Sequence, residues 1–303
     1  MTISLRQIVN SSFGIKLAVM LGSGLPPQLG YCVADYLAAR IASQRNSQLV
    51  RAIRANQWVV RGEPRDGSIL DRAVSDTLRH SARSMYDLYH YIHDTEATRR
   101  LIILDPAVQQ LTRRPELDER GLMIVGLHLS NFDLVLQWMC LQGMKLFALT
   151  IPDPQGSQRM EFEMRKRTGM NLVPVSFKAI RQALCHLQRG GMVVTGIDRP
   201  TPSPKASPCF FGRPSGLPIH HVYLAIKAKV PIVIIVVNSQ ADGKYRVLAS
   251  DLIEMDPIPN REQEILQNAE KVLRIAEDFI RQSPSQWSVT LPVWPETLEL
   301  VPD

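Results

Sequence analysis

The sequence predicts an α/β fold with a mainly parallel central sheet flanked by helices and a helical N-terminal subdomain. Three observations support this prediction. Short apolar runs alternate with amphipathic stretches from about residue 121 onward, residues 1–95 carry helical periodicity, and 45% of the 303 residues are apolar. Strands that alternate with helices need crossover connections, and these connections produce parallel sheets.

The N-terminal part is expected to be helical because its apolar residues recur at every fourth position. One such series runs through Leu29, Val33, Leu37 and Ile41, and another through Leu70, Val74 and Leu78. Turn sequences at 62–64 and 66–68 separate the two series. We therefore expect a helical N-terminal region over 1–95, packed as one unit with an α/β domain over 96–303.

Within the α/β domain each apolar run is expected to be a strand and each amphipathic stretch a helix. Strands are expected at 121–127, 145–150, 171–175, 191–197 and 231–237. Helices are expected near 130–143, 155–168, 178–189 and 218–229. A hairpin-like strand at 245–250 and a helix over roughly 261–282 follow, and a proline-rich, irregular tail ends the fold.

The net charge of +6 is concentrated at the N-terminal end. Residues 1–65 hold eight basic and two acidic residues, beside the apolar stretch 13–25, which is too short and too interrupted to span a membrane. No small-residue cleavage site marks this stretch as a secretory signal. A basic, apolar N-terminus suits a helix that lies on an anionic membrane surface. The alternatives are a solvated basic face and an RNA-binding patch, but the patch lacks the interleaved aromatic residues that stack on single strands.

Cofactor-binding patterns are not found in the sequence. The four cysteines are widely separated, which is typical of reduced residues in a cytosolic protein. His90 and His93 have the spacing of a zinc pair but no third ligand near them. No glycine loop of the P-loop or dinucleotide-binding type is present. We expect no metal and no bound cofactor.

The segment G-L-H-L-S-N-F-D (126–133) carries the chemistry that stands out most clearly. It places His128 and Asp133 directly after an apolar strand, at the edge of a parallel sheet where ligands bind. Asp198 follows the strand at 191–197 and belongs to the same edge. A structural interpretation is also open, because Ser130 and Asp133 match a helix capping box and His128 suits a buried structural histidine.

A histidine held in one tautomer by a carboxylate is a general base for a hydroxyl group. The sequence has no G-x-S-x-G motif and no serine or cysteine placed as a nucleophile. The pair must then activate a hydroxyl of the substrate or water. This favours direct acyl transfer to an alcohol, without a covalent enzyme intermediate.

The H-L-S-N-F-D box resembles the H-x4-D/E box of the lysophospholipid and glycerolipid acyltransferase superfamily. The most similar branch holds the lipid A biosynthesis (lauroyl/myristoyl) and phosphatidylinositol mannoside acyltransferases. Further similar stretches lie at 51–58, 164–175, 177–194, 196–200 and 208–218, so the resemblance covers roughly residues 45–240. The chain departs from the lipid A members at D-R-P (198–200), where those members tend to carry a second acid.

The resemblance implies roles for particular residues. His128 would be the base, Asp133 its orienting acid, and Arg165 a phosphate ligand. Asp198 would hold the acceptor head group or brace the histidine loop. Phe210, Phe211 and Gly212 would form a wall of the acyl or pantetheine channel, or alternatively core and a turn. Other candidates for substrate contact are Ser130, Asn131 and Arg199.

The resemblance further implies a peripheral acyltransferase on the cytoplasmic face of the cell membrane. Its co-substrate would be acyl-CoA or an acyl carrier protein, and its acceptor a lysophospholipid or glycolipid; no nucleic acid is expected. Two alternatives remain open at this stage. One is a hydrolase that uses the same pair on water to cleave thioesters or lipid esters, and the other is a catalytically silent lipid-binding protein.

Overall fold

The computed structural model describes residues 24–91, 93–113, 120–151, 157–202, 204 and 206–302. The apolar stretch 13–25 lies almost entirely outside these residues, as do the two basic residues Arg6 and Lys16. In the described part, no helix is both long and apolar enough to cross a membrane.

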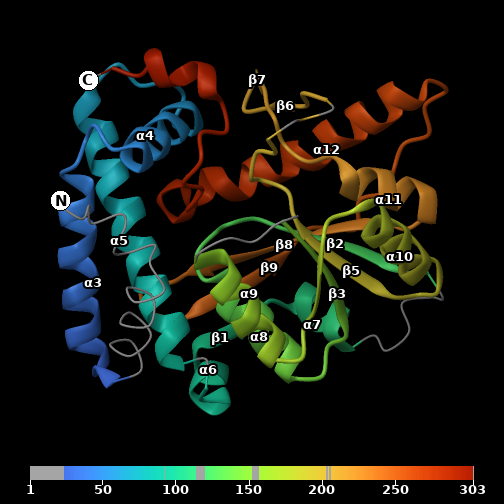
Figure 1. Ribbon diagram of the computed structural model, residues 1–303, viewed down its shortest axis with the longest axis horizontal. Helices are drawn as coiled ribbons and strands as arrows, with labels where there is room; N and C mark the ends of the chain where they lie inside the picture. The colour runs from blue at the N-terminus through green and yellow to red at the C-terminus, as the bar shows by residue number, and fades with distance from the viewer. Residues whose placement is uncertain are drawn as a thin grey trace.

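A seven-stranded sheet in the order β1-β9-β8-β2-β5-β3-β4 forms the centre of the fold (Figure 1). Five neighbouring strands are parallel: β8 (Ile232–Ser239), β2 (Leu122–Gly126), β5 (Met192–Gly196), β3 (Leu146–Thr150) and β4 (Asn171–Pro174). β9 (Tyr245–Ala249) pairs antiparallel with β8, so the expected hairpin is present. The mainly parallel α/β sheet is confirmed, and the five parallel strands end at one common edge.

The sequence pattern did not predict the three short strands β1, β6 and β7. β1 (Ile102–Leu104) pairs parallel with β9 at the edge of the sheet, and β6 (Cys209–Phe210) pairs antiparallel with β7 (Arg213–Pro214). Two or three residues are too few to show a period of two. These strands therefore depend on their tertiary setting and leave no clear pattern in the sequence.

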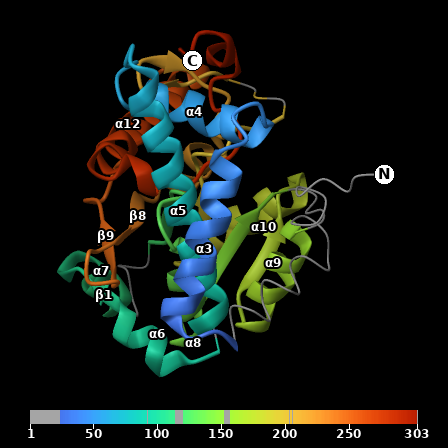
Figure 2. The same cartoon turned by 90° about the vertical axis from the view of Figure 1, so that its left-hand side faces the viewer.

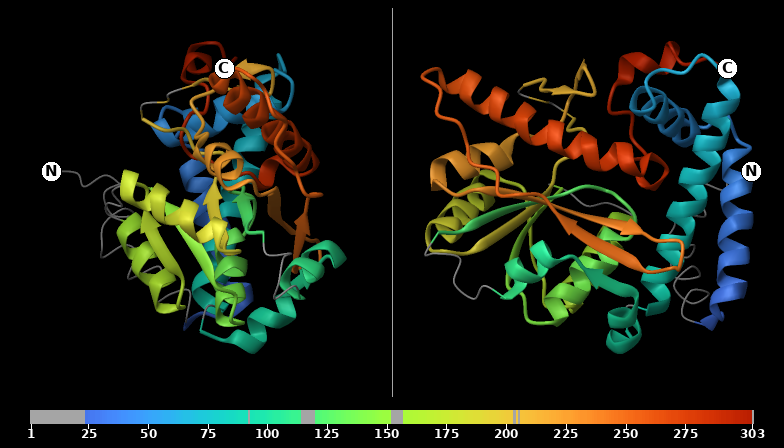
Figure 3. Two further views of the ribbon diagram at one scale, coloured as in Figure 1. Left: turned by 90° about the vertical axis from the view of Figure 1, so that its right-hand side faces the viewer. Right: turned by 180° about the vertical axis from the view of Figure 1, so that it is seen from behind.

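Helices cover both faces of the sheet (Figure 3). α10 (Phe177–Gln188), α11 (His220–Ala228) and α12 (Arg261–Gln282) bury apolar residues in one core cluster with Met123, Val125 and Val193. α7 (Pro106–Arg113), α8 (Phe132–Leu141) and α9 (Ser157–Arg167) pack on the opposite face. Successive strand residues point to opposite faces, which explains why both clusters draw on the same strands.

The N-terminal region folds into three helices over the described residues up to Tyr91. These are α3 (Pro27–Ala42), α4 (Gln48–Val60) and α5 (Gly67–Tyr91), and the short α6 (Thr95–Leu101) follows. α3 and α5 lie side by side along one flank of the sheet (Figure 2). Ala38, Val50, Ile53, Val74 and Leu78 form a separate apolar core between the three helices. The predicted helical N-terminal region is therefore present.

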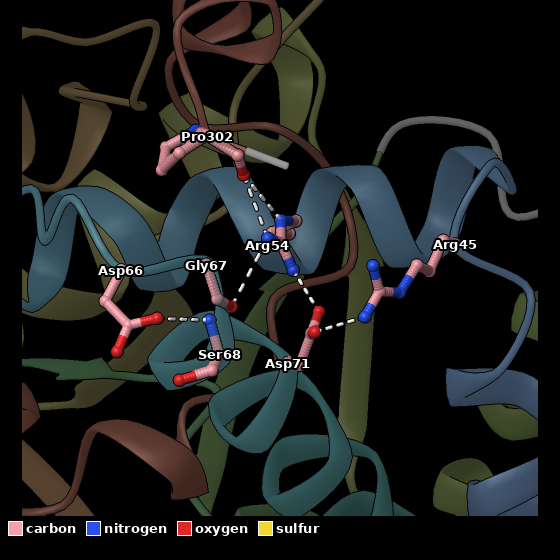
Figure 4. A network of polar contacts seen from close by, with 7 residues as sticks. All are labelled: Arg45, Arg54, Asp66, Gly67, Ser68, Asp71 and Pro302. Carbon is pink, nitrogen blue, oxygen red and sulfur yellow. Dashed lines mark hydrogen bonds and ion pairs between the residues drawn. The ribbon is translucent and has the colours of Figure 1, made fainter.

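Arginines of the N-terminal region form ion pairs with other parts of the chain (Figure 4). Arg54 on α4 pairs with Asp71 on α5, and its Nη2 donates to the carbonyl of Pro302 at 2.8 Å. Arg45 pairs with the same Asp71, and Arg51 pairs with Glu299. These ion pairs tie α4 to α5 and to the end of the chain, so part of the charge excess has a structural role.

The C-terminal tail is a buried part of the core. Two short 3-10 turns, Pro284–Gln286 and Pro295–Glu299, flank a segment in which Trp287, Val293 and Trp294 are almost fully buried. The side chain of Asn56 on α4 holds this segment, because its Nδ2 donates to the carbonyl oxygens of Val289 and Leu291. The predicted tail is irregular, but it is packed between the helical region and the sheet.

Candidate active site

His128 lies two residues beyond the end of β2, at the common edge of the parallel strands. Its Nδ1 is 2.6 Å from Oδ1 of Asp198, and its backbone N–H donates to Oδ2 of the same carboxylate at 2.7 Å. Asp198 follows β5, which pairs with β2 in register from Leu122 to Gly126. Neighbouring strands that end together therefore bring an acid and a histidine 70 residues apart into contact.

Asp198 is fully buried and accepts three hydrogen bonds. The third comes from Nε1 of Trp287, at 2.8 Å from Oδ2. Burial alone would raise the pKa of Asp198, but the charge of His128 and hydrogen bonds from His128 and Trp287 hold this pKa below its ordinary value. An ionised Asp198 keeps the proton of His128 on Nδ1. The other ring nitrogen, Nε2, is then left as a base.

The imidazole ring of His128 lies between Gly196, which has no side chain to crowd it, and the ring of Phe132. Gly196 faces the ring, and a Cβ at this position would stand only 3.3 Å from Cε1. The ring of Phe132 meets the imidazole edge-on, with 4.9 Å between the ring centroids. The His128 side chain keeps 16% of its surface exposed, so part of the ring is open to solvent.

The tail segment 286–288 holds the backbone of the histidine loop. Ser288 donates to the carbonyl oxygen of His128 from its N–H at 2.9 Å and from Oγ at 3.0 Å. The N–H of Ser130 donates to the carbonyl oxygen of Gln286 at 2.9 Å. Sequence reasoning missed this segment, and its only signal was a tryptophan whose N–H needs a partner when buried.

The hydrogen bonds of Asp133 among the described residues go to Arg165 and Gln137, whereas the resemblance implied that this acid orients His128. Its carboxylate receives two hydrogen bonds from Arg165 on α9, Nε to Oδ1 at 2.8 Å and Nη2 to Oδ2 at 2.7 Å. Nε2 of Gln137 adds a third at 3.2 Å. Burial of Asp133 is outweighed by the charge and hydrogen bonds of Arg165, which hold its pKa below the ordinary value. The pair fastens α8 to α9, and Arg165 faces this acid instead of an open phosphate site.

The predicted capping box is displaced by one residue. α8 begins at Phe132, its N-cap is Asn131, and the Oδ1 of Asn131 accepts from the N–H of Leu134 at 3.4 Å. Ser130 has a positive φ of 50°, which is strained for a residue with a side chain. Both Ser130 and Asn131 are buried, and the side chain of Asn131 contacts protein groups. Both residues shape the loop that carries His128.

The Phe-Phe-Gly block (Phe210, Phe211 and Gly212) packs next to Trp287, the indole donor to Asp198. Phe210 is fully buried and packs on Trp294, with 5.5 Å between the ring centroids, and on Trp287, with 6.2 Å. Phe211 stacks below the guanidinium of Arg281 at 4.8 Å, and Gly212 takes a positive φ of 73° in the turn. Phe210 is therefore core, as the alternative interpretation held. It packs against Trp287, whose indole N–H donates to Asp198.

Arg199 follows Asp198 directly and is half-buried at the same edge. Its Nε is shielded from solvent and has no hydrogen-bond partner among the described residues. A buried guanidinium N–H without a protein acceptor is suited to binding an anion.

The arrangement fits base catalysis on a hydroxyl. In the described part of the chain no side chain forms a hydrogen bond with Nε2 of His128, so no serine or cysteine takes the position of a nucleophile. A hydroxyl brought to Nε2 would give up its proton to the imidazole, and Asp198 would stabilise the imidazolium that forms.

A comparison with protein families identifies a family for this chain. The sequence profile of the bacterial lipid A biosynthesis acyltransferases matches residues 108–295. The match includes His128, Asp198 and Trp287 and extends well beyond residue 240, where the resemblance of the motifs ended. The departure at 198–200 does not remove the chain from the lipid A group. No protein of curated function matches the sequence.

Proposed function

Because the chain belongs to the bacterial lipid A biosynthesis acyltransferase family, we propose that this acyltransferase uses His128 and Asp198 to acylate a lipid hydroxyl. The donor is an acyl thioester, on CoA or on an acyl carrier protein, and the acceptor is a lysophospholipid or glycolipid. No metal or bound cofactor takes part. The observation that carries the proposal is the 2.6 Å contact between His128 Nδ1 and buried Asp198, which leaves Nε2 for the substrate.

The reaction proceeds by direct attack on the thioester. Nε2 of His128 removes the proton of the acceptor hydroxyl while the hydroxyl oxygen attacks the carbonyl carbon of the thioester. The tetrahedral intermediate then collapses, the carbon–sulfur bond breaks, and the imidazolium returns the proton to the leaving thiolate. Asp198 stays ionised throughout and stabilises the imidazolium. The acyl chain passes from sulfur to oxygen without a covalent enzyme intermediate.

Arg199 binds an anionic group of one substrate. The donor carries phosphate on its phosphopantetheine arm, and a lysophospholipid acceptor carries phosphate on its head group. Arg199 directly follows Asp198 in the sequence, and its shielded Nε, which no described group satisfies, supports this role. Arg165 gives two hydrogen bonds to Asp133, so we favour Arg199 for this role.

The enzyme acts as a peripheral protein on the cytoplasmic face of the membrane. Leu29, Val33, Tyr36 and Leu37 form an exposed apolar stripe on α3, with 39–66% of each residue accessible. Such a stripe is suited to contact with the acyl region of a lipid surface. This stripe supports the membrane contact more strongly than the charge does, because several of the arginines are paired within the protein.

The test is an acyl-transfer assay with radiolabelled palmitoyl-CoA and palmitoyl carrier protein. Each donor is offered with a panel of lysophospholipids and glycolipids, to the wild type and to His128→Ala. His93→Ala serves as the control, because His93 is an exposed histidine outside the site. We expect a labelled lipid that disappears in His128→Ala and persists in His93→Ala. Free fatty acid as the sole product would identify a hydrolase, and lipid binding without turnover would identify a silent binding protein.

A further inference from the structure

A chain of buried hydrogen bonds connects the N-terminal helices to the histidine loop. Its centre is Asp87 on α5, which is 4% exposed. The hydroxyl of Tyr31 on α3 donates to Oδ1 of Asp87 at 2.8 Å, and the hydroxyl of Tyr245 on β9 donates to Oδ2. Nδ2 of Asn131 in turn donates to the Tyr245 hydroxyl oxygen at 3.4 Å. The elements α3, α5 and β9 thus meet at the Asp87 carboxylate, and the loop joins them through the Tyr245 hydroxyl.

The two tyrosine hydroxyls stabilise the ionised form of the buried Asp87 carboxyl. Burial raises the pKa of Asp87, and the hydrogen bonds from Tyr245 and Tyr31 oppose this rise. A buried carboxylate without donors is strongly destabilising. Burial and the neighbouring Asp87 raise the pKa of Tyr245 above its ordinary value, so its hydroxyl keeps the proton that it donates.

Asn131 is the point at which this chain reaches the catalytic loop. It lies between His128 and Asp133 and is 3% exposed. Its Nδ2 also donates to the carbonyl oxygen of Ser84 on α5 at 2.9 Å, while its Oδ1 caps α8. The loop is therefore held from α5 and β9 on one side and from the tail segment 286–288 on the other.

We propose that Tyr245 is a positioning residue for the acyl transfer, acting through Asn131 and backed by Asp87. The proposal rests on the proposed function of His128 and Asp198. Tyr245 keeps the loop 128–133 in the register that places the imidazole on Asp198 and leaves Nε2 facing the substrate. A misplacement of about 1 Å in such a group lowers rates by as much as roughly 10²-fold.

Tyr31 provides a matched control inside the same network. Both tyrosines donate to Asp87, so replacing either with phenylalanine removes one donor from the same buried carboxylate. Only Tyr245 contacts the loop through Asn131. A purely structural role predicts similar effects of the two substitutions on catalysis, whereas a positioning role predicts different ones.

The experiment compares Tyr245→Phe and Tyr31→Phe in the full-length protein. We expect kcat to fall about 10-fold in Tyr245→Phe with little change in the KM of either substrate, and to stay near the wild-type value in Tyr31→Phe. The thermal midpoints should fall in both variants. Equal kcat values in the two variants would overturn the proposal.

A second readout does not depend on turnover. In protein with ¹⁵N-labelled histidine, the Nδ1–H proton of His128 in contact with Asp198 gives an NMR signal that His128→Ala removes. We expect this signal to shift or broaden in Tyr245→Phe and to remain in place in Tyr31→Phe. An unchanged signal in Tyr245→Phe would overturn the positioning role. If the wild type transfers no acyl chain, the proposed function fails, but this signal still decides whether Tyr245 positions the loop.

Discussion

Trp287 donates its indole N–H to Oδ2 of Asp198 at 2.8 Å, across a separation of 89 residues, and both residues are almost fully buried. The same oxygen accepts from the backbone N–H of His128, so Oδ1 alone faces the imidazole. The tryptophan therefore helps to fix which carboxylate oxygen meets the imidazole of His128. A residue of the C-terminal tail thus belongs to the site as closely as the motif residues do.

Replacing Trp287 with phenylalanine tests this contact. The variant removes one donor from a buried carboxylate while it keeps an aromatic ring against Phe210. We expect the free energy of unfolding to fall by about 1.5–3 kcal/mol, as for a lost hydrogen bond to a charged group. We also expect kcat to fall about 10-fold because Asp198 is less firmly held. Chemical denaturation and initial rates measure the two effects.

Trp294→Phe is the control for this change. Trp294 is also fully buried and stacks on Phe210, but its Nε1 has no hydrogen-bond partner among the described residues. The variant loses a similar part of an indole ring without touching Asp198. Its kcat should stay close to that of the wild type, and an equal loss in both variants would assign the effect of Trp287 to packing.

Asp198→Asn should reverse the tautomer of His128. Oδ2 accepts two N–H donors, from His128 and Trp287, so the amide oxygen of asparagine must take this place. The amide NH₂ then faces Nδ1, which becomes an acceptor, and the ring proton moves to Nε2. Nε2 of His128 then no longer acts as a base, although asparagine has the same shape as aspartate. We expect kcat/KM to fall by roughly 10²–10⁴-fold. Wild-type rates in this variant would show that Asp198 does not orient the base.

We expect Asp133→Ala mainly to lower the stability of the fold. The substitution removes the buried carboxylate that accepts two hydrogen bonds from the guanidinium of Arg165. Breaking a buried pair in this way costs about 3–5 kcal/mol. The double variant Asp133→Ala with Arg165→Met removes both charges and should recover part of the loss. Urea denaturation of the three proteins measures the coupling, and additive effects would contradict the pairing.

The sequence allowed the sheet, its helices and the position of His128 to be predicted, because each depends on local patterns. Apolar runs mark the strands, and a polar residue directly after a strand must lie at the sheet edge. The partner of His128 could not be predicted in this way. Asp133 is near in sequence, but a helix begins between the two residues and directs its carboxylate towards α9.

Asp198 was recognised as belonging to the edge, yet its contact with His128 depends on strand order. The sequence does not state that β5 lies beside β2, and only this neighbourhood brings the two residues together. Trp287 is further removed, since it reaches the site from an irregular segment between two short turns. No periodicity marks such a segment, so its role became visible only in three dimensions.

The buried histidine His220 makes the stability of the fold depend on pH. Its Nε2 lies 3.2 Å from Oγ1 of Thr195, and burial lowers the pKa of His220 to about 4. The unfolded chain, with a histidine pKa of about 6.5, binds the proton more strongly. Stability from this group is complete above about pH 6.5 and is lost as the pH falls towards 4.

Denaturation at about pH 7 and about pH 5 measures this effect. At the lower pH the wild type should lose about 2 kcal/mol through His220. His220→Gln should lose correspondingly less over the same interval, whatever its stability at pH 7. His93→Gln, which changes an exposed histidine, should keep the pH dependence of the wild type. Equal slopes in all three proteins would exclude His220 as the source.

Arg199→Gln tests the proposed anion site beside the dyad. The substitution keeps an N–H donor but removes the charge, so contacts to phosphate weaken while Asp198 and His128 keep their geometry. A charged hydrogen bond of about 1.5–3 kcal/mol corresponds to a rise in KM of roughly 10- to 100-fold for the substrate whose phosphate binds there. The comparison of KM for donor and acceptor identifies this substrate. Arg246→Gln on β9, an exposed arginine paired with Asp105, is the control and should leave both KM values unchanged. Unchanged KM values in Arg199→Gln with a large fall in kcat would instead place the guanidinium on the oxyanion of the transition state.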